Sequence, residues 1–156
     1  MEPTEDELAY VDKVANFFVA EGLPLIPGRV IGWLLISDPP EQTPAQLAAA
    51  LRVSRSSISS ALKLLTPSGL VEGTRRPGDR HEYLRIAPDG WSRMLERRYA
   101  YTTAFREITE QGLELLGDAE AERRERLEHV VDLYRFLELE LPALLERWRT
   151  QRTEGH

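Results

Sequence analysis

One stretch of the sequence, residues 47–65, limits the possible folds more than any other. It reads Leu-Ala-x-x-Leu-x-Val-Ser-x-x-x-Ile-Ser-x-x-Leu-x-x-Leu. Apolar residues recur at helical spacing on both sides of a short break, and Ser54 stands where a helix N-cap is favoured. The pattern predicts a helix-turn-helix in which Val53 fills the turn and the second helix buries only one of its faces.

The opposite face of that second helix carries small polar and basic side chains. They are Arg55, Ser56, Ser59, Ser60 and Lys63. A short helix of this kind can enter the major groove of DNA, where serine bonds to a base or a phosphate and a cation meets a guanine edge or a phosphate. The alternative is an ordinary pair of amphipathic helices with a solvated, serine-rich surface.

A strand–turn–strand pattern follows the two helices directly. Two β-like runs, residues 70–75 and 81–86, are joined by Arg-Pro-Gly-Asp-Arg, in which Pro and Gly favour a hairpin turn. A helix-turn-helix followed by a hairpin is a winged helix, and arginines on such a turn can enter the minor groove. We expect Asp79 to orient Arg76 or Arg80 through a charge-assisted hydrogen bond. The candidate DNA contacts on the turn are Arg75, Arg76, Asp79 and Arg80.

The charge distribution supports this interpretation although the net charge is −6. Residues 51–86 hold seven basic and three acidic side chains, a net charge of +4, whereas the rest of the chain carries −10. A basic segment inside an acidic chain predicts a local phosphate-binding face.

Helical patterns flank the winged helix on both sides. The expected fold is mainly α with a small β-hairpin wing, in the order α-α-α-α-β-β-α-α. Asp118 is expected to cap the last helix, and Pro142 to kink or end it. The expected parts are an N-terminal helix of a dimerisation region (1–22), a winged helix-turn-helix DNA-binding domain (23–88), a C-terminal helical dimerisation region (89–150) and a disordered tail (151–156).

The last helix carries an apolar stripe from Leu127 to Leu141 among dense charges. The winged domain is too small to cover both long helices, so the stripe predicts a homodimer. A helical hairpin that packs on the first helix of the same chain is the alternative. A dimer would place its two recognition helices roughly 34–36 Å apart, on a pseudo-palindromic operator in double-stranded DNA.

Other classes of protein are disfavoured. The chain has no Cys, and its three His residues lack the spacing of metal ligands, so no metal or cofactor is expected. No apolar run approaches the ~18 residues of a membrane span, and the acidic start is unlike a signal peptide, so a cytoplasmic protein without membrane insertion is expected. An enzyme would have to use Glu72, Asp79, His81 and Glu82, which lie along a solvent-facing hairpin without any catalytic motif.

DNA binding of this kind can be controlled by a signal, and the sequence offers aromatic residues rather than thiols or a metal cluster. We expect a hydrophobic small-molecule effector where the long helices meet the winged domain. The alternative is that these residues only fill the core. The candidates are Phe17, Phe18, Trp33, Trp91 and Tyr99.

The chain resembles a known family through two segments, residues 28–38 (Gly-Arg-Val-Ile-Gly-Trp-Leu-Leu-Ile-Ser-Asp) and the Pro-Gly-Asp-Arg wing followed by Tyr83. These look like the GbsR branch of the MarR-type transcriptional regulators, and most like actinobacterial members associated with exporter control. The resemblance covers roughly residues 8–145 and implies a DNA-binding repressor that dimerises through its first helix and its last two. A winged helix that binds a protein rather than DNA is the alternative. The DNA-contact roles that the resemblance implies fall on Ser56, Ser59, Ser60, Lys63, Asp79 and Arg80.

Overall fold

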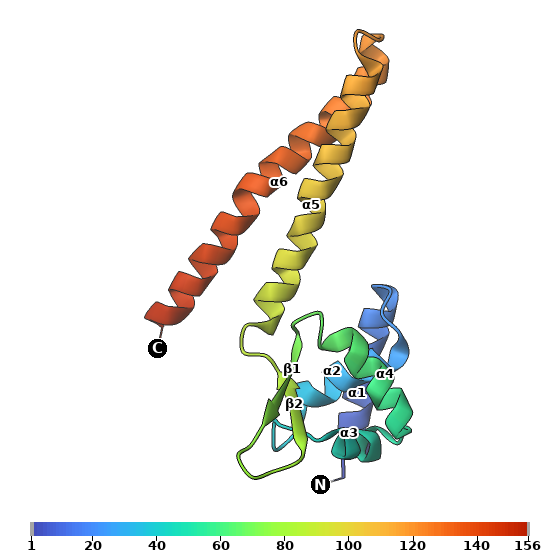
Figure 1. Cartoon of the computed structure of the whole chain (residues 1–156), viewed down its shortest axis with the longest axis vertical. Helices are drawn as coiled ribbons and strands as arrows, with labels where there is room; N and C mark the ends of the chain where they lie inside the picture. The colour runs from blue at the N-terminus through green and yellow to red at the C-terminus, as the bar shows by residue number, and fades with distance from the viewer. Residues whose placement is uncertain (1, 156) are drawn as a thin grey trace. The chain divides into compact units, whose positions relative to one another are not determined.

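The computed structural model describes residues 2–155, and within them the chain forms six helices and one two-stranded hairpin (Figure 1). The chain divides into two compact units, Met1–Arg93 and Met94–His156. The mainly helical winged-helix fold predicted from the sequence is confirmed. The elements are α1 (Glu5–Ala20), α2 (Leu25–Ile36), α3 (Pro44–Leu51), α4 (Arg55–Leu65), β1 (Val71–Arg75), β2 (Glu82–Ile86), α5 (Gly90–Leu116) and α6 (Ala121–Glu154).

Side-chain caps start three of the helices, and the cap at Ser54 is the one predicted above. The Thr4 hydroxyl accepts a hydrogen bond from the Glu7 amide, and the Glu7 carboxylate accepts one from the Thr4 amide. Thr43 and Gln46 form the same reciprocal pair at α3. Ser54 caps α4. Each cap satisfies amide groups that a helix start otherwise leaves without partners.

Helix α2 is the centre of the first unit and packs along α1. Two glycines one turn apart, Gly28 and Gly32, face α1 so closely that an added Cβ would lie 2.9 Å from the Ala15 Cα and 3.1 Å from the Val11 Cα. Seven of the twelve residues of α2 are buried, so this helix lies in the core of the unit. The Arg29 side chain then ties α2 to its neighbours, because it bonds to Asp12 on α1 and to the last carbonyl of α3.

Helices α3 and α4 form the predicted helix-turn-helix. Leu47, Leu51 and Ile58 are fully buried between them and α2, as expected for the residues that seat the pair. The turn passes through Arg52, which adopts a left-handed conformation with φ 55°. Val53 follows and donates its amide hydrogen to the Ala48 carbonyl, so the turn is closed by backbone bonding.

The wing is an antiparallel hairpin of β1 and β2, and its register pairs Val71 with Ile86. A backbone bridge between Gln42 and Leu84 adds one residue on the other side of β2. At the tip, the Asp79 amide donates to the Arg76 carbonyl at 3.0 Å. Proline and a glycine with φ 79° occupy the two central positions, as a type II turn requires.

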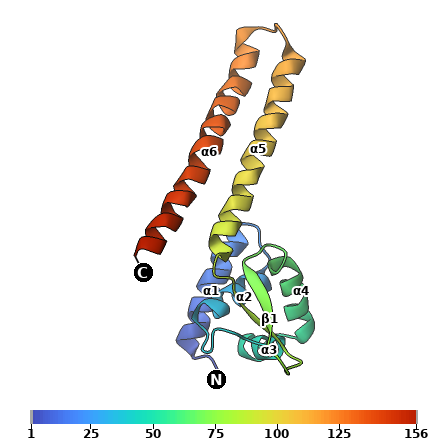
Figure 2. The same cartoon turned by 60° about the vertical axis from the view of Figure 1, so that its left-hand side comes forward.

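The second unit is an antiparallel pair of long helices, with α6 running back along α5 (Figures 1 and 2). Polar contacts join them: Arg106 and Thr103 on α5 both bond to Glu138 on α6. Val131 and Leu145 are the buried apolar residues among those described in this unit. The pair therefore has little apolar core of its own.

The end of the chain differs from the expectation. Asp118 does not cap α6; Glu120 occupies the N-cap position because the link after α5 extends three residues beyond Gly117. Pro142 does not end the helix, which continues to Glu154 and includes residues 151–154 of the expected disordered tail. A proline removes a single amide donor, and the bonds on either side of it can sustain a long helix. His156 lies outside the described residues.

Helix α2 begins at Leu25, and Pro24 occupies its N-cap position. Residues 2–22 belong to the same compact unit as the winged helix, and their role in a dimerisation region stays a prediction. None of the helices, in the part of the chain that the structure describes, is long and apolar enough to cross a membrane.

Candidate nucleic-acid interface

Helix α4 separates a buried face from a polar one, as its sequence predicts. Ile58, Ala61 and Leu65 are buried, and the hydrophobic side of the helix rests on the core. The Ser54 hydroxyl accepts the Ser57 amide hydrogen at 3.1 Å, so the helix starts on a serine cap. The five residues expected to face DNA are all exposed: Arg55, Ser56, Ser59, Ser60 and Lys63.

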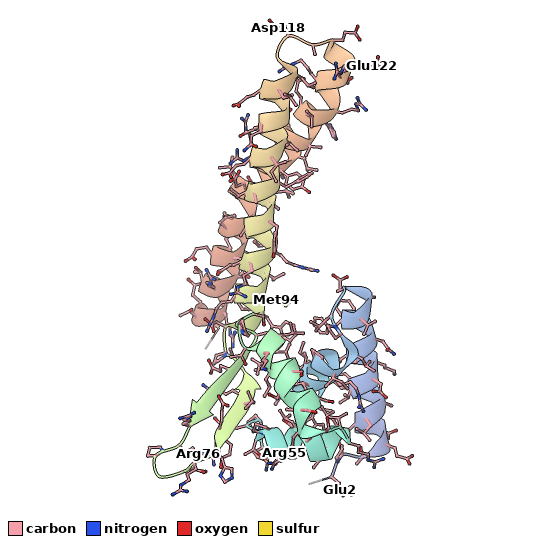
Figure 3. The ribbon with its side chains drawn as sticks, turned by 45° about the vertical axis from the view of Figure 1, so that its right-hand side comes forward. Glu2, Arg55, Arg76, Met94, Asp118 and Glu122 are labelled. Carbon is pink, nitrogen blue, oxygen red and sulfur yellow. The ribbon has the colours of Figure 1, made fainter. Side chains whose placement is uncertain are left out.

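The wing lies in the same unit, and its tip and the start of α4 reach the same end of that unit. Figure 3 shows this through Arg55, at the beginning of α4, and Arg76, just beyond β1. Arg75 and Arg80 on the wing are exposed. A single DNA duplex could therefore meet both elements, which is how a winged helix contacts two grooves.

Internal ion pairs decide which cations of the first unit are available to a ligand. Arg29, Arg85 and Arg93 pair with carboxylates of the same unit, as does Arg76. The cations that form no ion pair among the described residues of this unit are Lys13, Arg52, Arg55, Lys63, Arg75 and Arg80. All of these except Lys13 belong to the helix-turn-helix or the wing. The unpaired positive charge is thus concentrated where the sequence predicted DNA contacts.

Asp79 does not orient an arginine, which corrects the sequence-based expectation. Its Oδ1 accepts hydrogen bonds from the His81 amide at 2.9 Å and the His81 ring at 2.7 Å, and its Oδ2 accepts one from the Tyr83 hydroxyl at 2.7 Å. The tight turn directs the carboxylate back over the residues that follow it, rather than toward Arg76 or Arg80. The Tyr83 hydroxyl, with help from His81, lowers the pKa of Asp79 well below its usual range.

Arg76 is also engaged within the protein. Its Nη2 lies 2.8 Å from Oε2 of Glu41, and its guanidinium lies 4.0 Å from the centre of the Tyr83 ring. The hydrogen bond to Glu41 raises the pKa of Arg76. The arrangement makes Arg76 a structural part of the wing in the free protein.

Two residues of this region could not be singled out from the sequence. Glu41 is 35 positions before Arg76, and no local pattern connects the two. Arg52 contributed to the basic segment, but its exposed position in the turn follows from a left-handed backbone that its sequence does not indicate.

The five aromatic residues predicted to bind an effector do not form a single cluster. Phe17 and Phe18 meet edge to face with centroids 5.2 Å apart, and Phe18 stacks on Trp91 at 6.3 Å. Trp33 is buried in the core, where its indole N–H approaches Gln42. Tyr99 belongs to the second unit and lines a cavity of about 390 Å³ between α5 and α6.

A helix-turn-helix with an exposed polar recognition face, followed by a basic β-hairpin, defines a winged-helix DNA-binding protein. Two family models match its two halves: "MarR family" over residues 21–81 and "MmpR5-like MarR family transcriptional regulator" over residues 89–151. The chain belongs to the MarR family of transcriptional regulators, and it is MmpR5-like. The predicted MarR-type resemblance is therefore confirmed, as is the assignment to DNA-binding regulators rather than enzymes.

Two similar proteins support this assignment along nearly the whole chain. The HTH-type transcriptional regulator MmpR5 of Mycobacterium tuberculosis is 32% identical over 148 residues, which are 95% of this chain and 89% of that protein. A crystal structure of a transcriptional regulator is 30% identical, with a TM-score of 0.79 over 93% of this chain and 99% of that one.

Proposed function

We propose that this MarR-family protein is a cytoplasmic, homodimeric repressor that binds a pseudo-palindromic operator. The observation that carries the proposal is the set of unpaired cations, which lies almost wholly on the helix-turn-helix and the wing. Cations that are free of internal carboxylates can neutralise DNA phosphates without first breaking an ion pair. Helix α4 enters the major groove, and the wing follows the adjacent backbone or minor groove.

The proposed contacts divide by chemistry. Arg55, near the start of α4, and the exposed Ser59 and Ser60 read base edges or the neighbouring phosphates. The Ser56 hydroxyl is exposed but already lies 3.0 Å from the hydroxyl of the Ser54 cap. Arg52, Lys63, Arg75 and Arg80 meet phosphates and set the position of the protein on the duplex. Arg76 and Asp79 support the wing from within, since their polar groups already have partners in the protein.

Apolar exposure in the second unit supports dimerisation. Described residues on both long helices expose large apolar side chains, although α5 and α6 already pack on each other through Phe105 and Tyr134. A second copy is the partner that would cover such faces in a symmetric regulator. The exposed residues are Tyr101, Phe105, Ile108 and Leu115 on α5, and Leu133, Phe136, Leu139, Leu144 and Trp148 on α6.

An apolar or amphipathic effector is part of the same proposal. Support comes from two separate features: the Phe17–Phe18–Trp91 ring cluster in the first unit, and the cavity beside Tyr99 in the second. A ligand that favours one arrangement of the two recognition helices would change operator affinity. Membership of the GbsR-like branch is likewise proposed, on residues 28–38 and the wing sequence.

The test is to sequence genomic DNA fragments that the purified protein retains, and then to measure binding to the recovered motif at increasing salt. We expect an inverted repeat and an affinity that falls steeply with salt, because DNA binding releases counterions. Retention of no DNA, with a folded protein, would instead favour the winged helix as a protein-interaction module. A thermal-shift screen of lipids, fatty acids and aromatic compounds, repeated with operator DNA, tests the effector.

A further inference from the structure

The Glu41 carboxylate links the body of the first unit to the wing at two places. Its Oε2 lies 2.8 Å from Arg76 Nη2, and its Oε1 lies 3.6 Å from Arg85 Nη1. Arg85 also pairs with Glu72 directly across the hairpin, at 2.7 Å. One acidic side chain from the link between α2 and α3 therefore contacts a cation just beyond the end of β1 and another near the end of β2.

The backbone that carries Glu41 is held firmly. The next residue, Gln42, is buried and exchanges two backbone hydrogen bonds with Leu84, at 2.9 and 2.8 Å. Its side-chain amide donates to the Pro39 carbonyl at 2.7 Å, and its side-chain oxygen lies 3.5 Å from the indole nitrogen of Trp33. The backbone next to Glu41 is thus anchored both to the core and to the middle of the wing.

The groups beyond Arg76 continue the connection toward the tip. Arg76 lies over the Tyr83 ring, the Tyr83 hydroxyl donates to Asp79, and Asp79 in turn accepts from the His81 amide and ring. The attraction between the cation and the ring helps to hold the guanidinium in place. A continuous set of side-chain contacts therefore connects Glu41 to the turn of the wing.

We propose that Glu41 is a positioning residue for DNA binding, which holds Arg76 against the wing so that Arg75 and Arg80 are presented to the duplex. The proposal rests on the function proposed above, in which the wing contacts DNA. Arg75 and Arg80 have no ion-pair partner among the described residues, whereas Arg76 has one. Glu41 acts through Arg76 and touches no DNA itself.

The first measurement is hydrogen exchange in the protein without DNA. Glu41→Ala should raise exchange at the amides of residues 76–81 about threefold to tenfold, the effect of losing one exposed ion pair and one stacked cation. Arg76→Ala should have the same effect from the other side of the contact, and the double variant should add nothing further. Glu82→Ala, which removes an exposed carboxylate of the wing that makes no ion pair among the described residues, is the matched control. Unchanged exchange in both Glu41→Ala and Arg76→Ala would overturn the proposal.

The second measurement is operator affinity as a function of salt. Relative to Glu82→Ala, which makes the same change in net charge, Glu41→Ala should bind DNA about threefold to tenfold more weakly with an unchanged salt slope. Tighter binding with a steeper slope would show instead that Glu41 competes with phosphate for Arg76, and would overturn the positioning role. If Arg75→Ala and Arg80→Ala both leave the slope unchanged while the exchange results hold, the wing does not contact DNA, and the proposed function fails rather than the positioning role of Glu41.

Discussion

Arg106 and Glu138 join the two long helices of the second unit through paired hydrogen bonds, from Nε to Oε2 at 2.6 Å and from Nη2 to Oε1 at 3.2 Å. Glu110 accepts a further bond from Arg106 and two from Arg135 on the opposite helix. A bidentate contact of this kind fixes geometry as well as charge. The network sets how α5 and α6 are aligned, in a pair of helices with few buried apolar residues.

Glu138→Gln should therefore lower the melting temperature by a few degrees, because it removes the charge that Arg106 and Thr103 both contact. Glu140→Gln, an exposed neighbour without an ion pair among the described residues, is the control. Calorimetry or circular dichroism gives the melting temperature. Equal melting temperatures for the two variants would show that the network adds nothing to stability.

The same network predicts a dependence on pH. Arg106 lowers the pKa of Glu138, and Arg135 followed by Arg106 lowers that of Glu110. A lowered pKa contributes stability above the usual carboxyl value of about 4.3, and this contribution is lost as the pH falls through the lower, folded-state value. Denaturant unfolding between pH 7 and pH 3 should show a smaller acid loss in Glu138→Gln than in the wild type. Parallel pH profiles for the two proteins would contradict the linkage.

Arg80→Ala should weaken binding to all DNA sequences alike. An exposed cation on the wing contributes a phosphate contact with little base information, so its loss should reduce the slope of log affinity against log salt by about one. Lys13→Ala removes an unpaired cation from α1, outside the helix-turn-helix and wing, and should leave the slope unchanged. Mobility-shift titrations at several salt concentrations make the comparison. An equal effect of both substitutions would mean that overall charge, rather than the wing, determines affinity.

Ser59→Ala and Ser60→Ala should each change the preferred base at one operator position, since both hydroxyls are exposed on the face of α4 opposite Ile58. A lost base contact costs about 1–3 kcal/mol of discrimination. Ser57→Ala is the control, because its hydroxyl is half-buried and bonded to Ser54 at 2.8 Å. Selection of binding sites from random DNA reads out the preference. One motif common to all three variants would contradict the assignment of the recognition face.

Ile108→Glu on α5 or Leu139→Glu on α6 should convert the proposed dimer to monomers, because each places a charge on a large exposed apolar face. Operator affinity should fall when the dimer is lost, since a monomer contacts only one half-site and binds it weakly. Light scattering gives the mass, and Glu107→Ala, an exposed neighbour on α5, is the control. A wild-type protein that is monomeric at micromolar concentration would refute the dimer itself.

Local signals allowed much of the fold to be predicted. Capping residues such as Thr4, Thr43 and Ser54 act on amides within one helical turn, so their sequence context is sufficient to place helix starts. The exposed face of α4 followed in the same way from helical periodicity. Asp118 failed as a cap because the link before α6 is longer than the sequence indicates.

Contacts between distant positions were beyond prediction. Glu41 meets Arg76 because the wing folds back toward the link between α2 and α3, and that approach depends on the packing of the whole unit. The local sequence does not show this contact, and it places Asp79 next to the arginines of the wing, so Asp79 was predicted to be their partner. The DNA-facing residues themselves remain predictions from exposure and charge.

The segment that carries the family resemblance begins with Gly28 and Arg29, and both serve the packing of α1, α2 and α3. Gly28 and Gly32 permit a backbone approach that even an alanine would disturb. A genetic selection for lost DNA binding should therefore recover substitutions at these positions, through folding, as readily as changes on α4. Proteins that share this segment therefore share the packing of their first helices. Because the segment does not include α4, such proteins can recognise unrelated operators.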